Sequence, residues 1–331
     1  MKHSRRWLSL GSVLTALILS AAPCLQARAA TDFPSKPVTL VVSFAPGGSA
    51  DILARVLAPS MSQSLGVPVV VTNILGASGM IATNHVAKSA PDGYTLLVTT
   101  SSPLALTPHT SKNVSYDPFL DFAPISLMGL APEVLALNSK VDVRDLPQLI
   151  EMAKRQGVTI STSGNGGLPH LALELLRSTT GLSRLEHVPY KAAGPAVADA
   201  VAGHVNGVLV DLPAVYGQIR DGKLRGILIA SSNRSEFLPD LKTAAEQGYP
   251  DVIAVNWTGL LAPARTPPEA VGKIHAALLT ALKDPANQAL LRGAAVEIAI
   301  SLTPDDFARF IRAEHAKWGK VVREAGVRAD D

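Results

Sequence analysis

The stretch VTLVVSFAPGGSADILAR, residues 38–55, decides the fold class. Residues 38–44 are nearly all apolar and rich in β-branched side chains, as in a strand that is buried on both faces of a sheet. After the diglycine turn, apolar residues from Ser49 onward recur on one face of a helix. A turn of this kind leaves free backbone N–H groups beside a helix N-terminus, which favours an anion.

The same alternation continues along the chain. Strands are expected over 67–73 and 94–100, with a helix over 80–88 between them. A second series of strands is expected over 133–138, 158–162, near His187, over 205–211 and over 224–230, with helices over 145–156, 168–179, 194–202 and 213–220. A strand over 255–263 and a helical tail follow, in which Thr266 and Thr303 are each expected to cap a helix. This order predicts an α/β fold with a largely parallel sheet, divided into two lobes that face each other across a cleft.

The first thirty residues have the pattern of an export signal. A basic start, MKHSRR, precedes a short apolar stretch, and Ala27-Arg28-Ala29 fits a cleavage site, so the mature chain is expected to begin near Ala30. An uncleaved N-terminal anchor is the alternative. The pair Arg5-Arg6 leaves the twin-arginine export route open, although Ser9 weakens that match.

Removal of this segment changes the interpretation of charge. It carries four basic residues and no acidic residue, so the formal charge goes from +3 to −1. The basic character of the whole chain therefore gives no reason to expect a nucleic-acid partner. Only 5% of the residues are aromatic, which also argues against a surface on which bases stack. The single cysteine, Cys24, is lost with the segment, which leaves a mature chain without disulfides, as is compatible with the bacterial envelope.

Three glycine-rich turns share one design. The first contains Gly47 and Gly48, the second contains Ala77 and Ser78 within residues 76–79, and the third covers residues 161–167. Each is expected at the carboxyl end of a strand and the start of a helix, where open α/β sheets bind ligands. Because the turns divide between the two series, they predict opposed anion-binding loops.

Four side chains near these turns have more than one interpretation. Asp51 either points away from the anion or meets it through a water or a ligand ammonium. His170 either donates to a ligand carboxylate or is a surface or helix-terminal residue. Asp211 either accepts a hydrogen bond from the ligand or caps the following helix, and Tyr190 either lines the cleft or packs.

The common motifs of catalysis and of cofactor binding are absent or incomplete in this sequence. There is no G-x-S-x-G, no H-E-x-x-H and no cysteine pair. The stretch GQIRDGKL ends in Leu224 where a phosphate-binding loop needs Ser or Thr, and GNGGLP lacks the third glycine of a dinucleotide loop. No cofactor and no metal are therefore expected. An exported hydrolase or isomerase that uses Asp51, Asp211 and His170 is the enzymatic alternative.

Taken together, several stretches resemble the Bug (TctC-like) extracytoplasmic solute receptors of tripartite tricarboxylate transport systems. They cover essentially the whole mature chain and are FPSKPVTLVVSFAPGGSADILAR (33–55), APDGYTLLVTTSS (90–102), YDPFLDFAPISL (116–127), SGNGGLPHLALELL (163–176), HVPYKAAGPAVADAVAGHV (187–205), WTGLLAPARTPPEAV (257–271) and FIRAEHAKWGKVVREAG (310–326). The resemblance is specific for the family and much less so for the ligand.

The resemblance implies a two-lobed periplasmic-binding-protein fold of type II, with two crossing strands between mostly parallel sheets. Its expected parts are a signal peptide at 1–29, lobe 1 at 30–132 plus 256–331, and lobe 2 at 133–255. The ligand-binding residues that it implies are Gly47, Gly48, Asp51, Ala77, Ser78, Ser101, Thr162, Asn165, His170 and Asp211. In this family, loop backbone groups and ordered waters hold the ligand carboxylate.

One departure from the family pattern lies in the second turn. The family reads N-R-P-G-A-G-G, and here the residues are Asn73-Ile74-Leu75-Gly76-Ala77-Ser78-Gly79. Loss of the Arg and Pro is expected to alter the stiffness of the loop or the choice of ligand, and Ser78 adds a hydroxyl.

The sequence therefore predicts a monomeric, non-catalytic periplasmic receptor. Its expected ligand is a small carboxylate: a di- or tricarboxylate, an acidic amino acid or an aromatic acid. Its expected partners are the subunits of a membrane transporter. A receptor that only signals through a sensor kinase is the alternative partner assignment.

Overall fold

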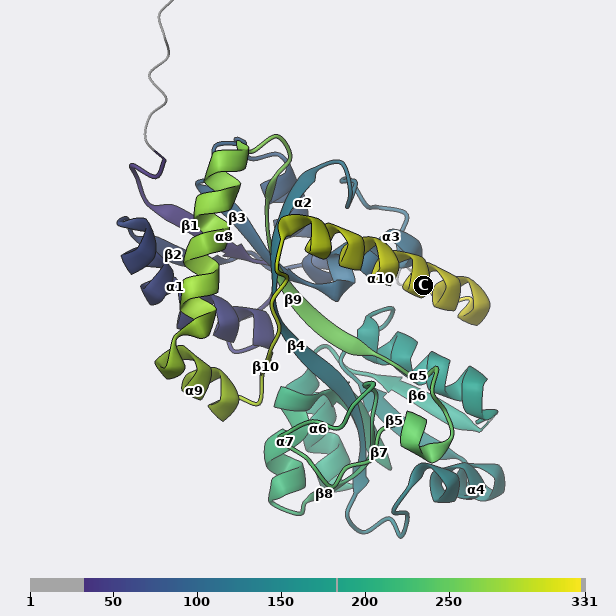
Figure 1. Cartoon of the computed structure of the whole chain (residues 1–331). Coiled ribbons are helices and arrows are strands. Elements are labelled where there is room, and N and C mark those ends of the chain that lie inside the picture. The colour runs from purple at the N-terminus through teal and green to yellow at the C-terminus, as the bar shows by residue number, and fades with distance from the viewer. Residues whose placement is uncertain (1–32, 183, 329–331) are drawn as a thin grey trace, which may run out of the picture. The chain divides into compact units, whose positions relative to one another are not determined.

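The computed structural model describes residues 33–182 and 184–328 (Figure 1). The predicted signal peptide over 1–29 lies outside these residues. Within them, ten strands form one sheet in the order β2-β1-β3-β9-β4-β7-β5-β6, with β10 and β8 also paired to β4. This is the α/β arrangement that the alternation of strands and helices predicts.

Three parallel strands begin the sheet. β1 (Val38–Val42) lies between β2 (Val69–Asn73) and β3 (Thr95–Thr100). Its residues are buried almost throughout, as expected for a central strand. Because the three strands are parallel, the loops that follow them leave the sheet at the same edge.

β4 (Phe122–Asn138) and β9 (Val255–Pro263) form an antiparallel pair in the middle of the sheet. β4 begins eleven residues before the predicted start at Glu133, so that prediction was wrong. Pro124 and Pro132 lie within the strand, and residues of this kind usually argue against one. Two irregularities in the β4–β9 register, at Pro124/Ser126 and Leu127/Gly129, accompany this long strand.

The other half of the sheet contains β5 (Val158–Thr162), β6 (Leu185–Pro189) and β7 (Gly207–Asp211), which are parallel. β7 and β8 (Leu224–Ile229) pair antiparallel with the far end of β4, whose other end pairs with β9 and with β10 (Glu297–Ile298). β4 is therefore common to both halves, as in a two-lobed fold joined by central strands.

Helices cover the sheet, most of them within one or two residues of the places that the periodicity predicts. They are α1 (Ser49–Leu65), α2 (Met80–Ala87), α3 (Thr107–Thr110), α4 (Leu146–Gln156), α5 (Leu168–Thr180), α6 (Ala193–Ala202), α7 (Leu212–Arg220), α8 (Pro268–Lys283), α9 (Pro285–Gly293) and α10 (Pro304–Ala325). The sequence analysis did not anticipate α3, the π-helical turn Ser102–Leu106 before it, or α9.

The two predicted caps of the tail have different outcomes. Thr303 caps α10 in a reciprocal capping box with Asp306, as predicted. Thr266 does not cap α8, because Pro267 occupies the cap position and the Thr266 hydroxyl donates to the carbonyl of Pro263 at 2.7 Å. The pair of prolines moves the helix start forward by one residue.

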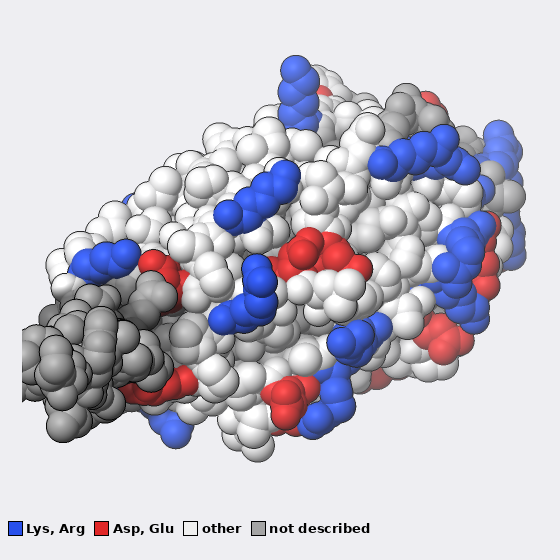
Figure 2. Space-filling view, turned by 90° about the horizontal axis from the view of Figure 1, so that it is seen from above, with Lys and Arg blue, Asp and Glu red and all other residues white. Residues whose placement is uncertain are grey.

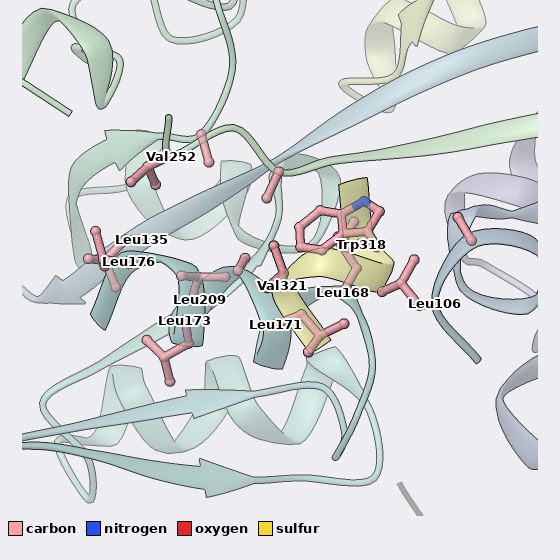
Figure 3. Packing of buried hydrophobic residues seen from close by; sticks show 14 of the residues in the cluster. Leu106, Leu135, Leu168, Leu171, Leu173, Leu176, Leu209, Val252, Trp318 and Val321 are labelled. Atoms are coloured by element: carbon pink, nitrogen blue, oxygen red, sulfur yellow. The ribbon is translucent and has the colours of Figure 1, made fainter. Parts of the chain in front are cut away.

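A large hydrophobic cluster joins the C-terminal helix to α5. Figure 3 shows Trp318 and Val321 of α10 among Leu168 and Leu171 of α5 and Leu106. Trp318 is completely buried, and α10 has the strongly amphipathic pattern expected of a helix that packs along one face. The cluster holds α10 against α5, the helix that follows the third glycine-rich turn.

We predict that Gly259→Ala destabilises the protein by about 1–3 kcal/mol or more. A Cβ at Gly259 in β9 would overlap the ring of Phe307, which is fully buried and packs edge-on against Trp257 with ring centroids 5.8 Å apart. Urea unfolding of the variant measures the loss.

The matched control is Gly272→Ala. Gly272 lies inside α8 with open space where the Cβ would go, so alanine is expected to raise stability by about 0.5–1 kcal/mol. Equal effects of the two substitutions would contradict close packing at Gly259.

Candidate functional site

The first loop, residues 44–48, is held by the carboxylate of Asp51. The backbone N–H of Gly47 donates to Asp51 Oδ2 at 3.0 Å, and Arg55 Nε donates to both carboxylate oxygens at 3.0 Å. Asn73 at the end of β2 donates from Nδ2 to Asp51 Oδ1 at 2.8 Å and to the carbonyl of Phe44 at 3.0 Å. Asp51 therefore ties the start of α1, the first loop and the end of β2 together.

These contacts explain how an acid can stand beside an anion-binding loop. Burial acts to raise the pKa of Asp51, but the hydrogen bonds from Arg55, Gly47 and Asn73 outweigh it, and the pKa lies below its usual value. The side chain is almost fully buried, and its charge is paired with Arg55. The carboxylate points into the protein, while the first N–H groups of α1 follow the exposed Gly48.

The second loop, residues 76–79, has left-handed backbone throughout. Four successive residues have positive φ, and two of them, Ala77 (48°) and Ser78 (52°), are not glycine. This conformation costs an L-residue roughly 1–2 kcal/mol. Residues 76–78 are exposed, whereas Gly79 is buried so closely that a Cβ would lie 2.7 Å from Pro103 and 3.2 Å from Phe44. The loop is therefore packed against both the first loop and the turn after β3.

Ser101 follows β3 and is fully buried. Its hydroxyl donates to Asn256 Oδ1 in β9 at 3.0 Å. This contact connects the third of the parallel strand ends to the central pair of strands.

The third loop, residues 163–167, is organised by Thr162 and His170. The Thr162 hydroxyl donates to the carbonyl of Gly164 at 3.1 Å and lies 2.7 Å from Nε2 of His187. The N–H of Gly166 donates to Nδ1 of His170 at 3.0 Å, so the proton of the neutral ring is on Nε2. Asn165 is exposed at the tip of the loop.

The two histidines are stacked, with ring centroids 4.0 Å apart and an angle of 18° between the planes. Burial, together with the charge of Arg177, lowers the pKa of His170 to about 4, and burial, together with His170, lowers the pKa of His187 to about 4. Both rings are neutral at pH 7. His170 is thus occupied in shaping the third loop, and its direct contact with a ligand stays a prediction.

Asp211 ends β7 and stands directly opposite Glu133 of β4 in the antiparallel register. Asp211 occupies the cap position of α7, but its side chain makes no capping hydrogen bond, so the predicted cap is absent. Glu133 is 1% exposed, and its Oε2 has no hydrogen-bond partner among the described residues. Burial raises the pKa of Asp211 to about 6, and burial and the charge of Asp211 raise the pKa of Glu133 well above its usual value.

The predicted residues fall into two groups by their place in the sheet. Gly47, Gly48, Asp51, Ala77, Ser78 and Ser101 form the first, and Thr162, Asn165, His170 and Asp211 form the second. The central strands β4 and β9 connect the groups. Tyr190, the remaining candidate, has its hydroxyl 2.5 Å from a carboxylate oxygen of Asp199. Among the described residues, no three His, Cys, Asp or Glu side chains gather closely enough to hold a metal ion.

The sequence profile described as the tripartite tricarboxylate transporter family receptor, TctC, matches residues 53–327. The chain belongs to this family. The receptor is 40% identical over 304 residues to the protein BugT of Bordetella pertussis, covering 90% of this chain and 92% of BugT.

Solved structures agree with this assignment. One is described as a periplasmic transporter and has a TM-score of 0.81 at 39% identity, covering 90% of this chain and all of that one. A second, from R. palustris with adipate, has a TM-score of 0.81 at 32% identity, and the match covers 90% of this chain and 99% of that one. A third, MatC from Rhodopseudomonas palustris with bound malate, has a TM-score of 0.77 at 30% identity, and the match covers 88% of this chain and 100% of that one. This receptor is therefore a periplasmic solute-binding protein of the TctC/Bug type, as the resemblance implies.

Several residues of the site were absent from the sequence prediction. Arg55 could have been found from its i+4 spacing to Asp51, which suits an ion pair on a helix. Glu133 could have been noticed as the only acid in the apolar run of β4. Asn73, His187 and Asn256 become neighbours of the loops only through strand pairing, and no local signal marks them.

We predict that Asp51→Asn destabilises the receptor at pH 7 by about 1–3 kcal/mol, because it removes a charged acceptor from Arg55 and Gly47. The folded-state pKa of Asp51 is depressed, so its contribution is present above the unfolded pKa near 3.8 and is lost as the pH falls below it. The difference between the two proteins should shrink toward pH 3, as thermal unfolding at several pH values would measure.

Glu269→Gln is the control for that substitution. Glu269 pairs with Lys273 on the exposed side of α8, and loss of such a surface pair is expected to cost less than about 1 kcal/mol. A loss in Asp51→Asn that stays constant down to pH 3 would contradict the proposed role of the charge.

We predict that Glu133→Gln stabilises the ligand-free receptor at pH 8 by about 1–3 kcal/mol and has little effect near pH 4.5. The folded-state pKa of Glu133 is raised, so the wild type loses stability as the pH rises above the unfolded value near 4.5. A glutamine is uncharged, as a protonated glutamate is, but it does not ionise when the pH rises.

Melting temperatures of both proteins across this pH range give the test. Glu151→Gln is the matched control, because Glu151 is fully exposed on α4. If the melting temperature of Glu133→Gln exceeds that of the wild type by an amount that does not grow with pH, ionisation of Glu133 is not the cause.

Proposed function

We propose that the receptor captures a small carboxylate in the periplasm and delivers it to a membrane transporter of the tripartite tricarboxylate type. The observation that carries this proposal is the set of three loops at the carboxyl ends of parallel strands, each leading into a helix (residues 44–48, 76–79 and 163–167). Backbone N–H groups in such loops bind carboxylates through hydrogen bonds and the helix dipole.

The internal contacts of the loops support a binding role. Asp51 and His170 each accept a backbone N–H of their own loop, so the glycines are held in place before any ligand arrives. A preorganised loop loses less conformational entropy on binding than a mobile one. The strained second loop supports the proposal as well, since such strain is concentrated at ligand-binding segments.

The relatives support the ligand class. One is solved with adipate and one with malate, both of which are small dicarboxylates. On the face of the molecule in Figure 2, Lys and Arg are interspersed with Asp and Glu, so the described residues of that face offer no broad patch of one sign. This distribution fits a receptor for a small solute better than one for a polyanion.

We also propose the division into lobe 1 (30–132 plus 256–331) and lobe 2 (133–255), with closure on the ligand. Closure needs only a higher ligand affinity in the closed state, and no chemical step. The closed receptor, as a monomer, would then dock on its transporter. The loops serve no catalytic purpose in this proposal, in which His170 holds the geometry of the third loop.

A thermal-shift screen of the mature protein from Ala30 onward tests the proposal. Mono-, di- and tricarboxylates, acidic amino acids and aromatic acids are compared with uncharged analogues. A carboxylate at about a hundred times its Kd should add roughly 2.7 kcal/mol of stability. The ligand is recovered unchanged if the protein is a receptor.

Asn165→Ala is expected to weaken binding of that ligand about tenfold, because Asn165 is exposed at the tip of the third loop. Asn233→Ala, at an exposed asparagine of another loop, serves as the control. Stabilisation by uncharged compounds alone would overturn the proposal.

A further inference from the structure

Five neighbouring strands of the sheet each present a polar side chain, and these side chains follow a diagonal of the strand register. In sheet order these are Ser101 after β3, Asn256 on β9, Glu133 on β4, Asp211 at the end of β7 and Thr162 at the end of β5. We call this set the polar row. It runs across the middle of the sheet, from the turn after β3 to the start of the third loop.

Register places the polar row on one face. Glu133 and Asp211 are direct partners, so their side chains share a face. Asn256 is the partner of Ala131, which lies two residues before Glu133. Thr162 is the partner of Leu209, two residues before Asp211. Ser101 joins through its hydrogen bond to Asn256.

The centre of the row carries two acids and no base. Directly opposed residues of an antiparallel pair have Cβ atoms about 4.5–5.5 Å apart, which brings the Glu133 and Asp211 carboxyl groups within reach of one another. No ion pair joins either one to a Lys, Arg or His among the described residues, and their flanking neighbours Asn256 and Thr162 are neutral. Glu133 Oε2 is buried with no hydrogen-bond partner there.

A buried carboxylate oxygen without a donor is unfavourable, and a second carboxyl group beside it adds repulsion. A group with several hydrogen-bond donors and a positive charge would satisfy the buried oxygen and also offset the repulsion between the two carboxyl groups. A primary ammonium does so, with three N–H donors and one charge. A second ligand carboxylate at this place would meet like charge instead.

We propose that the Glu133–Asp211 pair is a subsite for the protonated amine of the ligand, which makes the ligand an amino-carboxylate. This inference rests on the proposed function, in which the glycine-rich loops hold the carboxylate. It narrows the ligand class within the family, because adipate and malate, the molecules bound by two relatives, contain no amine.

Calorimetric titration of the mature receptor with matched pairs of acids tests the subsite. The pairs are aspartate and succinate, glutamate and glutarate, 2-aminoadipate and adipate, and 4-aminobutyrate and butyrate, with malate as a hydroxyl analogue. In the pair whose carbon chain suits the spacing between the loops and the subsite, the amine is expected to improve affinity about 10- to 100-fold, as a charge-assisted hydrogen bond does.

Glu133→Gln and Asp211→Asn assign that preference to the pair. In each variant, the affinities for the amino acid and for its amine-free analogue should differ by no more than a few-fold. Binding of the analogue itself is expected to be unchanged or improved. Glu151→Gln, on exposed α4, should keep the full preference. A melting curve of each variant shows that it is folded, and either variant alone is sufficient for the test.

The two hypotheses fail in different ways. Tight binding of succinate, glutarate, adipate, butyrate or malate over its amine analogue would overturn the amine subsite and leave carboxylate capture standing. An amine preference that survives both substitutions would also overturn it. Absence of binding by every acid would overturn the proposed function itself.

Discussion

β4 has to satisfy the backbone hydrogen bonds of two half-sheets at once. Its first part pairs with β9 and β10, and its last part pairs with β7 and β8. A strand buried between neighbours on both edges tolerates few side chains that are not apolar. An acid at Glu133 in this position is therefore the most costly residue of the strand, and it lies where the two halves meet.

The loops depend on this central strand pair for their arrangement. The parallel strands on either side bring their carboxyl ends to β9 and β4, where Ser101 contacts Asn256 and Asp211 stands opposite Glu133. The first and third loops are each fixed from within by one side chain, Asp51 in the first and His170 in the third. Both side chains could have been taken as ligand contacts or catalytic groups, but the structure gives them partners inside the protein.

Two kinds of electrostatics therefore coexist in one site. The carboxylate of Asp51 is neutralised by Arg55 and hydrogen-bonded on both oxygens, so its pKa is lowered. Among the described residues, Glu133 Oε2 has no hydrogen-bond partner and neither Glu133 nor Asp211 pairs with a base, and burial raises the pKa of both groups. The first carboxylate stabilises the fold, whereas the second pair costs stability, and costs of this kind are characteristic of functional positions.

The sequence by itself determined the α/β class, the place of nearly every helix and strand, and the three glycine-rich loops. These are local properties, because hydrophobic period, glycine and proline act over a few residues. The resemblance in motifs extended this to the family. The long β4 escaped prediction because Pro124 and Pro132 imitate strand breaks, and the register irregularities near Pro124 are visible only in the folded sheet.

Only the tertiary structure decided what the polar residues do. Asp51 and Asn73 are 22 residues apart, Thr162 and His187 are 25 apart, and Ser101 and Asn256 are 155 apart. No local pattern encodes such contacts, because strand order and register bring them together. The pairing of Glu133 with Asp211 arises in the same way, since a carboxyl group becomes buried and unpartnered only when the sheet forms around it.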